Sequence, residues 1–236
     1  MKERPMHCSA DDLPAAVRDL GMRLGVPPGG SEEAIVTLTQ AGHMKRQLGS
    51  PSWMAFTARQ TIAPTTCAFE WRARFGPLGS ISVCDALADG QARLDVMALG
   101  FIPLARTAPT AALLRGERMR YLAELAWAPD AILANADLRW RGDGPDRLVV
   151  RTGDGPAAAE ITMTLDGDGR IASTFAADRP RAAVEPTLPT PWRGRFSDYR
   201  LHLGRWLPFA GEVAWVIDGR EEVYWRGALT SWSMAA

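Results

Sequence analysis

The chain has 236 residues, enough to bury a sizeable hydrophobic core, so it needs neither a metal ion nor a disulfide to fold. Its 27 basic and 27 acidic residues cancel and are interleaved, so it lacks the basic stripe with which proteins bind nucleic acids. Its cysteines, Cys8, Cys67 and Cys84, are odd in number and lack CxxC spacing, which is typical of reduced thiols and predicts a cytoplasmic location.

Two segments bear on membrane targeting. Residues 1–12 are charged and polar and lack the apolar stretch of a signal peptide. The longest apolar run, residues 96–105, contains Gly100 and Pro103 and is about half as long as a bilayer-spanning helix. We therefore expect no membrane span, and a monomer or homodimer whose subunit is a single domain over residues 1–236.

The first expected element is a short helix near the N-terminus. Asp11 and Asp12 are suited to cap it, and Pro14 falls within its first turn. Gly25 and the prolines that follow it end the helix. The apolar positions of this segment recur at helical spacing and are Leu13, Val17, Leu20 and Leu24.

Residues 33–105 change to a period of two, which predicts strands. Trp71, Ala73 and Phe75, for example, alternate with arginines. Turn residues such as Asp89-Gly90 recur at short intervals, and this spacing favours antiparallel hairpins over parallel βαβ units.

One long helical stretch follows, at residues 109–135. It is rich in Ala, Leu, Arg and Glu, which are good helix formers, and Pro129 is expected to kink or end it. One face is apolar, and a second face is polar and aromatic and includes Tyr121 and Glu124.

Strands resume after the helix. Residues 161–165 alternate cleanly, and the Asp-Gly-Asp-Gly sequence at 166–169 predicts a hairpin turn into residues 171–175. A proline-rich connector at 180–191 leads to three more strands. The predicted fold is therefore α+β: one large, curved, half-barrel-like antiparallel sheet, a short N-terminal helix, and one long helix covering the concave face. Such a helix encloses a volume beneath it, which predicts an apolar pocket for a small molecule.

Motifs for cofactors and metals are missing from the sequence. It contains no GxGxxG, no GxxxxGK[ST], no HExxH and no GxSxG pattern. The histidines, His7, His43 and His202, are far apart and lack metal-ligand spacing. We therefore expect a protein without cofactor or metal.

One candidate site lies on the long helix. Tyr121 and Glu124 are three residues apart, so their side chains are expected to share a face. A carboxyl group beside a phenol and facing an apolar cavity has its pKa raised by desolvation, which suits it to acid or base catalysis. The plainer alternative is that Glu124 forms an exposed ion pair with Arg120, four residues earlier.

A second candidate site consists of charges on the strands. Glu212 and Arg226 fall on strands that should be neighbours. A cross-strand ion pair between them would stabilise the sheet, and this structural role is favoured over a functional one. Asp85 and Arg72 are two further charged residues that can point inward from their hairpins.

Short segments spread over most of the chain form a series: Leu13-Pro14, Val17-Arg18, Trp53, Phe56-Thr57-Ala58, Gln60, Phe69-Glu70-Trp71-Arg72-Ala73-Arg74, Gly116-Glu117, Arg120-Tyr121-Leu122-Ala123-Glu124, Trp127, Asp178-Arg179-Pro180-Arg181, Pro189-Thr190-Pro191-Trp192 and Tyr224-Trp225-Arg226-Gly227. In this order they resemble a bacterial family known only as a domain of unknown function. The resemblance implies a fold similar to the curved half-barrel of the outer-membrane lipoprotein carrier proteins, and it supplies no catalytic residues. The chain departs from the family in having small residues around Trp127 and Asp85, from which we expect a pocket adapted to its own ligand.

The leading functional hypothesis is a cofactor-free enzyme, a cyclase, isomerase or lyase, that encloses a small hydrophobic metabolite. Glu124 would act as acid or base and Tyr121 as its proton partner, with Asp85 as a third catalytic candidate. The candidate substrate-binding residues are Arg72, Arg120, Trp127, Arg181, Trp192, Tyr199, Trp225 and Arg226.

Two alternatives to an enzyme remain open. A non-catalytic carrier of a lipid or another apolar ligand predicts a larger cavity, open at one side, and tolerance of Glu124→Gln. A partner-binding domain predicts no enclosed cavity and a flat, exposed apolar patch instead.

Overall fold

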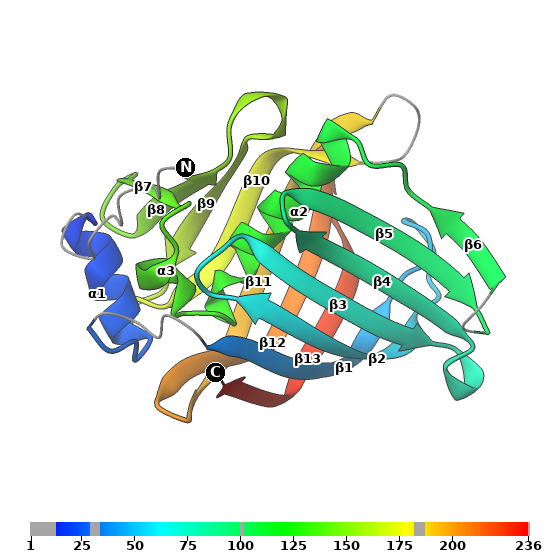
Figure 1. Ribbon diagram of the computed structural model, residues 1–236, viewed down its shortest axis with the longest axis horizontal. Coiled ribbons are helices and arrows are strands. Elements are labelled where there is room, and N and C mark those ends of the chain that lie inside the picture. The colour runs from blue at the N-terminus through cyan, green and yellow to red at the C-terminus, as the bar shows by residue number, and fades with distance from the viewer. Residues whose placement is uncertain (1–12, 29–33, 100–101, 182–186, 236) are drawn as a thin grey trace, which may run out of the picture.

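The computed structural model describes residues 13–28, 34–99, 102–181 and 187–235 (Figure 1). These residues form one 13-stranded antiparallel sheet, with strand order β6-β5-β4-β3-β2-β1-β13-β12-β11-β10-β9-β8-β7. The strands are β1 (Ile35–Met44), β2 (Met54–Ala63), β3 (Ala68–Phe75), β4 (Ile81–Ala88), β5 (Gln91–Ala98), β6 (Ile102–Arg106), β7 (Arg139–Gly142), β8 (Arg147–Thr152), β9 (Ala159–Leu165), β10 (Ile171–Arg181), β11 (Leu188–His202), β12 (Arg205–Ile217) and β13 (Arg220–Ala235).

The sheet consists of two meanders joined by the first and last strands. β1 pairs with β13 along its whole length, so the N-terminal and C-terminal halves become one surface. Tight turns link successive strands: Asp89 and Gly90, between β4 and β5, have φ of 51° and 71°, the left-handed values that two-residue hairpin turns require. The sheet curls into a half-barrel (Figure 1), so the predicted fold class is confirmed.

The helices are shorter than the sequence predicts. They are α1 (Ala15–Arg23), α2 (Ala111–Ala123) and α3 (Ala131–Ala134), with 3-10 turns at η2 (Pro77–Gly79), η3 (Glu124–Ala126) and η4 (Gly155–Ala157). The single helix expected over 109–135 is therefore wrong in length. Thr110 caps α2 by accepting a hydrogen bond from the Leu113 backbone N–H at 3.1 Å. Beyond η3, Pro129 cannot donate the hydrogen bond that would continue the helix.

The start of α1 also differs from the expectation. Pro14 occupies the N-cap position rather than the first turn, and its own side chain makes no capping hydrogen bond. Asp11 and Asp12, the expected caps, lie outside the described residues.

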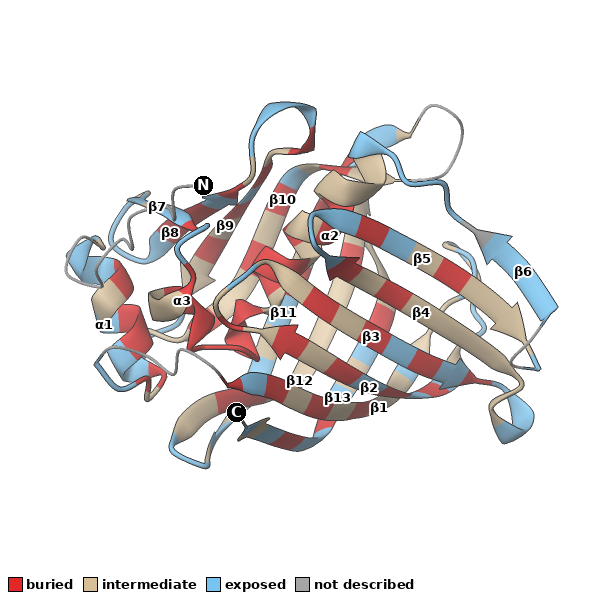
Figure 2. Cartoon of the chain, viewed as in Figure 1, coloured by how far each residue is buried: buried red, intermediate tan, exposed pale blue. Residues whose placement is uncertain are grey.

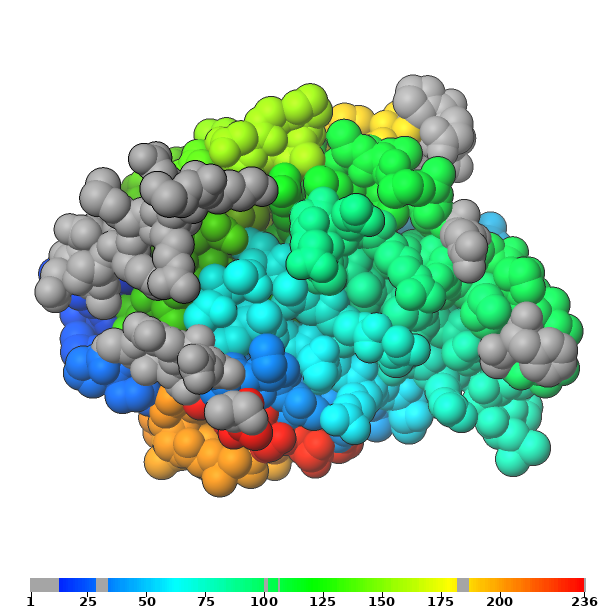
Figure 3. Space-filling view, in the orientation of Figure 1, coloured from blue at the N-terminus to red at the C-terminus, as the bar shows by residue number. Residues whose placement is uncertain are grey.

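Helix α2 lies in the concavity of the sheet, between β4–β5 on one side and β9–β10 on the other (Figure 1). Its buried residues are Gly116, Glu117, Met119, Tyr121, Leu122 and Ala123, which point in several directions from the axis. Strands alternate between buried and more exposed positions (Figure 2), so one sheet face forms the core together with α2. Side chains fill most of the gaps that the ribbon leaves on the viewed side (Figure 3).

One end of the half-barrel is held by a buried ion pair. Arg205 donates from Nε and Nη2 to the two carboxylate oxygens of Asp130, each at 2.8 Å, and Asp130 is fully buried. Arg205 also donates to the Gly25 carbonyl at 2.9 Å. The pair therefore ties the segment after α2 to β12 and to the end of α1.

Candidate functional site

A cavity of about 230 Å³ lies between α2 and the inner faces of both halves of the sheet. Four tryptophans, Trp71, Trp127, Trp192 and Trp225, line it. Its other apolar wall residues include Met44, Val83, Leu94, Phe196 and Val213. Most of the surface is therefore aromatic or aliphatic, as in sites that take small apolar molecules.

Glycines on β11 and β12 make room for this cavity. Gly194 and Gly211 both line it, at strand positions where other residues would project a side chain inward. A Cβ at Gly211 would lie 3.0 Å from the Trp127 ring, so the indole rests against the bare backbone. Glycine inside a strand is a known sign of such close approach. This role was not predicted, because the glycines of the sequence were interpreted only as turn residues.

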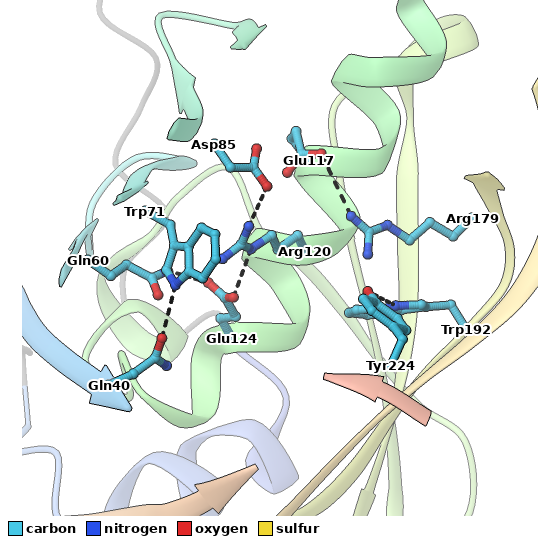
Figure 4. A network of polar contacts seen from close by, with 10 residues as sticks. All are labelled: Gln40, Gln60, Trp71, Asp85, Glu117, Arg120, Glu124, Arg179, Trp192 and Tyr224. Atoms are coloured by element: carbon cyan, nitrogen blue, oxygen red, sulfur yellow. Dashed lines mark hydrogen bonds and ion pairs between the residues drawn. The ribbon is translucent and has the colours of Figure 1, made fainter. Parts of the chain in front are cut away.

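Arg120 is the centre of a buried polar network on the α2 side of the cavity (Figure 4). It donates to Asp85 and, from Nε, to Glu124 Oε1 at 2.9 Å. Gln60 donates to the other oxygen of Glu124. The side chains of Arg120, Asp85 and Glu124 are only 15%, 10% and 12% exposed. The ion pair between Arg120 and Glu124 that the plainer alternative predicted is therefore present, but it is buried rather than exposed on the surface.

Two carboxylates stabilise the charge of Arg120 in this network. Burial alone would lower the pKa of Arg120, but the carboxylates of Glu124 and Asp85 outweigh it and hold that pKa above its usual value. The guanidinium also lies over the Trp71 ring, 5.0 Å from its centroid. With two carboxylates bound, Arg120 is poorly placed to take an anionic ligand.

A second, looser pair lies across the cavity. Glu117, one helical turn before Arg120, faces Arg179 of β10, with 3.7 Å between Oε1 and Nη2. Arg179 covers the Trp192 ring at 4.4 Å, and Trp192 donates its indole N–H to the Tyr224 hydroxyl at 3.1 Å. Burial raises the pKa of Glu117 well above its usual value, and the nearby Asp85 raises it further. Neither Glu117 nor Arg179 was predicted as a site residue.

Tyr121 does not share the cavity with Glu124, contrary to the expectation. Its hydroxyl donates to the Ala63 carbonyl at 2.9 Å and accepts from Asn135 Nδ2 at 2.8 Å, on another side of α2. Glu124 falls where α2 passes into the 3-10 turn η3, so the α-helical spacing from which a shared face was predicted ends there. Burial raises the pKa of the neighbouring Cys67 thiol to about 11, so this thiol stays protonated near neutral pH.

Tyr121→Phe is expected to lower the free energy of unfolding by about 1–3 kcal/mol, because it removes two hydrogen bonds, one to the Ala63 carbonyl and one from the buried Asn135 amide. Chemical denaturation measures the loss. Ligand binding in the cavity should be unchanged, and a strong loss of binding by the folded variant would contradict the structural role.

Four of the other predicted residues line the cavity and four do not. Asp85, Trp127, Trp192 and Trp225 line it. Those that make their contacts elsewhere are Arg72, paired with exposed Glu70 at 2.7 Å; Arg226, paired with Glu212 at 2.8 Å; Arg181, which donates to Thr190 at 3.3 Å; and Tyr199, which donates to the Ile171 carbonyl at 2.8 Å. Arg72 therefore points outward, because it alternates with inward-facing Trp71 along β3.

Comparison with models of known protein families shows which family the chain belongs to. A family model described as a family of unknown function, DUF6544, matches residues 5–227. The chain belongs to this family. The expected relationship to a bacterial family of unknown function is thus confirmed, and comparison with curated proteins finds no match.

Solved structures resemble this DUF6544 protein in fold. A DUF1329 family protein from Desulfovibrio piger matches with a TM-score of 0.50 and 10% identity, over 92% of this chain and 91% of that one. A LolA superfamily protein from Nitrosomonas europaea matches with a TM-score of 0.49 and 8% identity, over 93% and 94%. Within the described part of this DUF6544 protein, helices are too short or too polar to cross a membrane, and no cluster of His, Cys, Asp and Glu is arranged to hold a metal ion.

Proposed function

We propose that this DUF6544 protein binds and carries a small amphipathic molecule, with its apolar part held between the tryptophans of the cavity. The observation that carries the proposal is the combination of a partly open, mainly apolar cavity with polar groups confined to particular positions on its wall. Trp127, Trp192 and Trp225 provide large rigid surfaces, and Gly194 and Gly211 leave room beside them.

Catalysis is less well supported than binding. The hypothesis of an enzyme depended on Tyr121 acting with Glu124, and these two side chains face different surroundings. Both oxygens of Glu124 are already engaged, one by Arg120 and one by Gln60. A group fixed in this way holds the helix in place more readily than it transfers protons to a ligand.

The first test is native mass spectrometry of the purified protein before and after organic extraction. A discrete small molecule that is lost on extraction would support a binding protein and would give the chemical class of its ligand. If the wild type converted that molecule and Glu124→Gln did not, the carrier proposal would fall in favour of an enzyme.

Filling the cavity is expected to abolish binding. Ala123 lies on α2, is 2% exposed and lines the cavity, so Ala123→Phe places a ring in the ligand's space. We expect at least about a tenfold loss of affinity for octanoate or 1-octanol, measured by calorimetry. The control is Ala111→Phe, at an exposed position in the first turn of the same helix.

Two results would contradict this proposal: a wild type that binds neither molecule and co-purifies with nothing, or an Ala123→Phe variant that binds as tightly as the wild type. Circular dichroism and thermal melting establish that each variant is folded. Ala123→Leu, a smaller change, covers the case in which the phenylalanine variant does not fold.

A further inference from the structure

We propose that the ligand carries a carboxylate, and that Arg179 binds this group at a subsite completed by the hydroxyl of Tyr224. The inference rests on the proposed binding function and specifies the chemistry of one end of the ligand.

Arg179 differs from Arg120 and Arg205 in how closely carboxylates approach its guanidinium group. Arg120 contacts two carboxylates, and Arg205 binds Asp130 through two hydrogen bonds. Arg179 is 9% exposed, yet within the described chain its ionic contact is Glu117 at 3.7 Å, longer than a hydrogen bond. Its guanidinium has several N–H donors in a planar fork, and it lines the cavity.

Glu117 does not supply the missing negative charge. Its carboxyl group is buried near Asp85, and both effects raise its pKa, so it stays neutral at pH values where an exposed glutamate is charged. Figure 4 shows the Glu117 carboxyl between Asp85 on one side and Arg179 on the other. A ligand carboxylate at Arg179 would supply the negative charge that a protonated Glu117 does not provide.

The Tyr224 hydroxyl adds a donor to the same part of the wall. It accepts the Trp192 N–H, so its own proton is left to donate, and Figure 4 shows it on the same side of the cavity as Arg179. A hydroxyl donor beside a cation, in a mainly apolar cavity, suits an anion.

A carboxylate fits this subsite better than a phosphate. A guanidinium fork pairs with a planar carboxylate through two parallel hydrogen bonds, and one negative charge balances one arginine. A doubly charged phosphate would leave an excess of negative charge in a cavity that already contains Asp85 and Glu124. The Trp192 ring lies 4.4 Å from the Arg179 guanidinium carbon, and this cation–π contact helps to hold the guanidinium at the cavity wall.

The test compares ligands that share one chain and differ in charge: octanoate, 1-octanol and octylamine. Calorimetry with the wild type is expected to show octanoate binding about 10- to 100-fold more tightly than 1-octanol. Arg179→Gln should remove most of this preference while changing 1-octanol affinity by less than about threefold. Arg179→Lys, which keeps the charge but loses the fork, should retain part of the preference.

Two further variants keep the test decisive. Arg181→Gln removes an arginine from the same strand but outside the cavity and should change no affinity. Tyr224→Phe keeps the ring stacked on Trp215 and should weaken octanoate selectively, even if Arg179→Gln does not fold.

Equal affinity of the wild type for octanoate and 1-octanol, or an equal loss of both in Arg179→Gln, would overturn the carboxylate subsite and leave the binding function standing. Tighter binding of octylamine would overturn it too, in favour of a cationic ligand held by the cavity carboxylates. If none of the three molecules bound to the wild type and nothing co-purified, the binding function itself would fail.

Discussion

Arg120→Met is expected to lower the free energy of unfolding by about 3–5 kcal/mol, because it leaves two buried carboxylates without their shared counter-ion. Asp85 comes from β4 and Glu124 from the turn that follows α2, so Arg120 also fixes the helix against the sheet. Methionine has a similar length and keeps much of the packing against Trp71, which separates the loss of charge from the loss of volume.

Urea denaturation followed by circular dichroism measures this effect, and Arg72→Met is the matched control. Arg72 pairs with Glu70 on the outer face of β3, where its side chain is 63% exposed, so its loss should cost less than about 1 kcal/mol. Adding Asp85→Asn and Glu124→Gln to Arg120→Met should recover part of the stability, because the stranded charges are then gone. An Arg120→Met variant as stable as the Arg72→Met control would show that the network contributes little.

The sheet follows from local sequence signals. The hairpin between β9 and β10 was predicted from clean alternation and from the turn at residues 166–169, and the pairing of Thr164 with Ser173 confirms it. Antiparallel pairing of neighbours along the chain needs only such short signals. The pairing of β1 with β13 could not be predicted from such signals, because it joins opposite ends of the chain and no local pattern encodes it.

The inward direction of the site residues was harder to predict. Tyr121 and Glu124 satisfy the helical spacing, but that spacing holds only while the helix continues, and α2 ends at Ala123, between the two residues. Arg179 lies beside a register shift in β10, between Ala176 and Arg179, so counting alternate residues along the strand does not assign its face. Tryptophan content is a better guide to the cavity, since the sequence has nine tryptophans and four of them line it.

Glu117→Gln is expected to stabilise the protein relative to the wild type by an amount that grows as the pH rises. Burial, with the nearby Asp85, raises the pKa of Glu117 in the folded chain above its value in the unfolded chain. Below both pKa values the proton is bound in both states and has no effect. As the pH rises through the unfolded pKa, the unfolded chain loses this proton while the folded chain retains it, so the wild type loses about 1.4 kcal/mol per pH unit until the folded pKa is reached. Glutamine does not titrate and avoids this loss.

Urea denaturation of both proteins from pH 4 to pH 9 gives the difference directly, and its slope identifies the buried carboxyl as the cause. The groups that face Glu117 are Asp85, Arg120 and Arg179, and all of them remain in the variant. Glu160→Gln, on the exposed face of β9, should show no such trend. A Glu117→Gln difference that stays constant with pH would mean that Glu117 is ionised in the fold and neutralises Arg179 itself, and the cavity would then have no free cation for an acidic ligand.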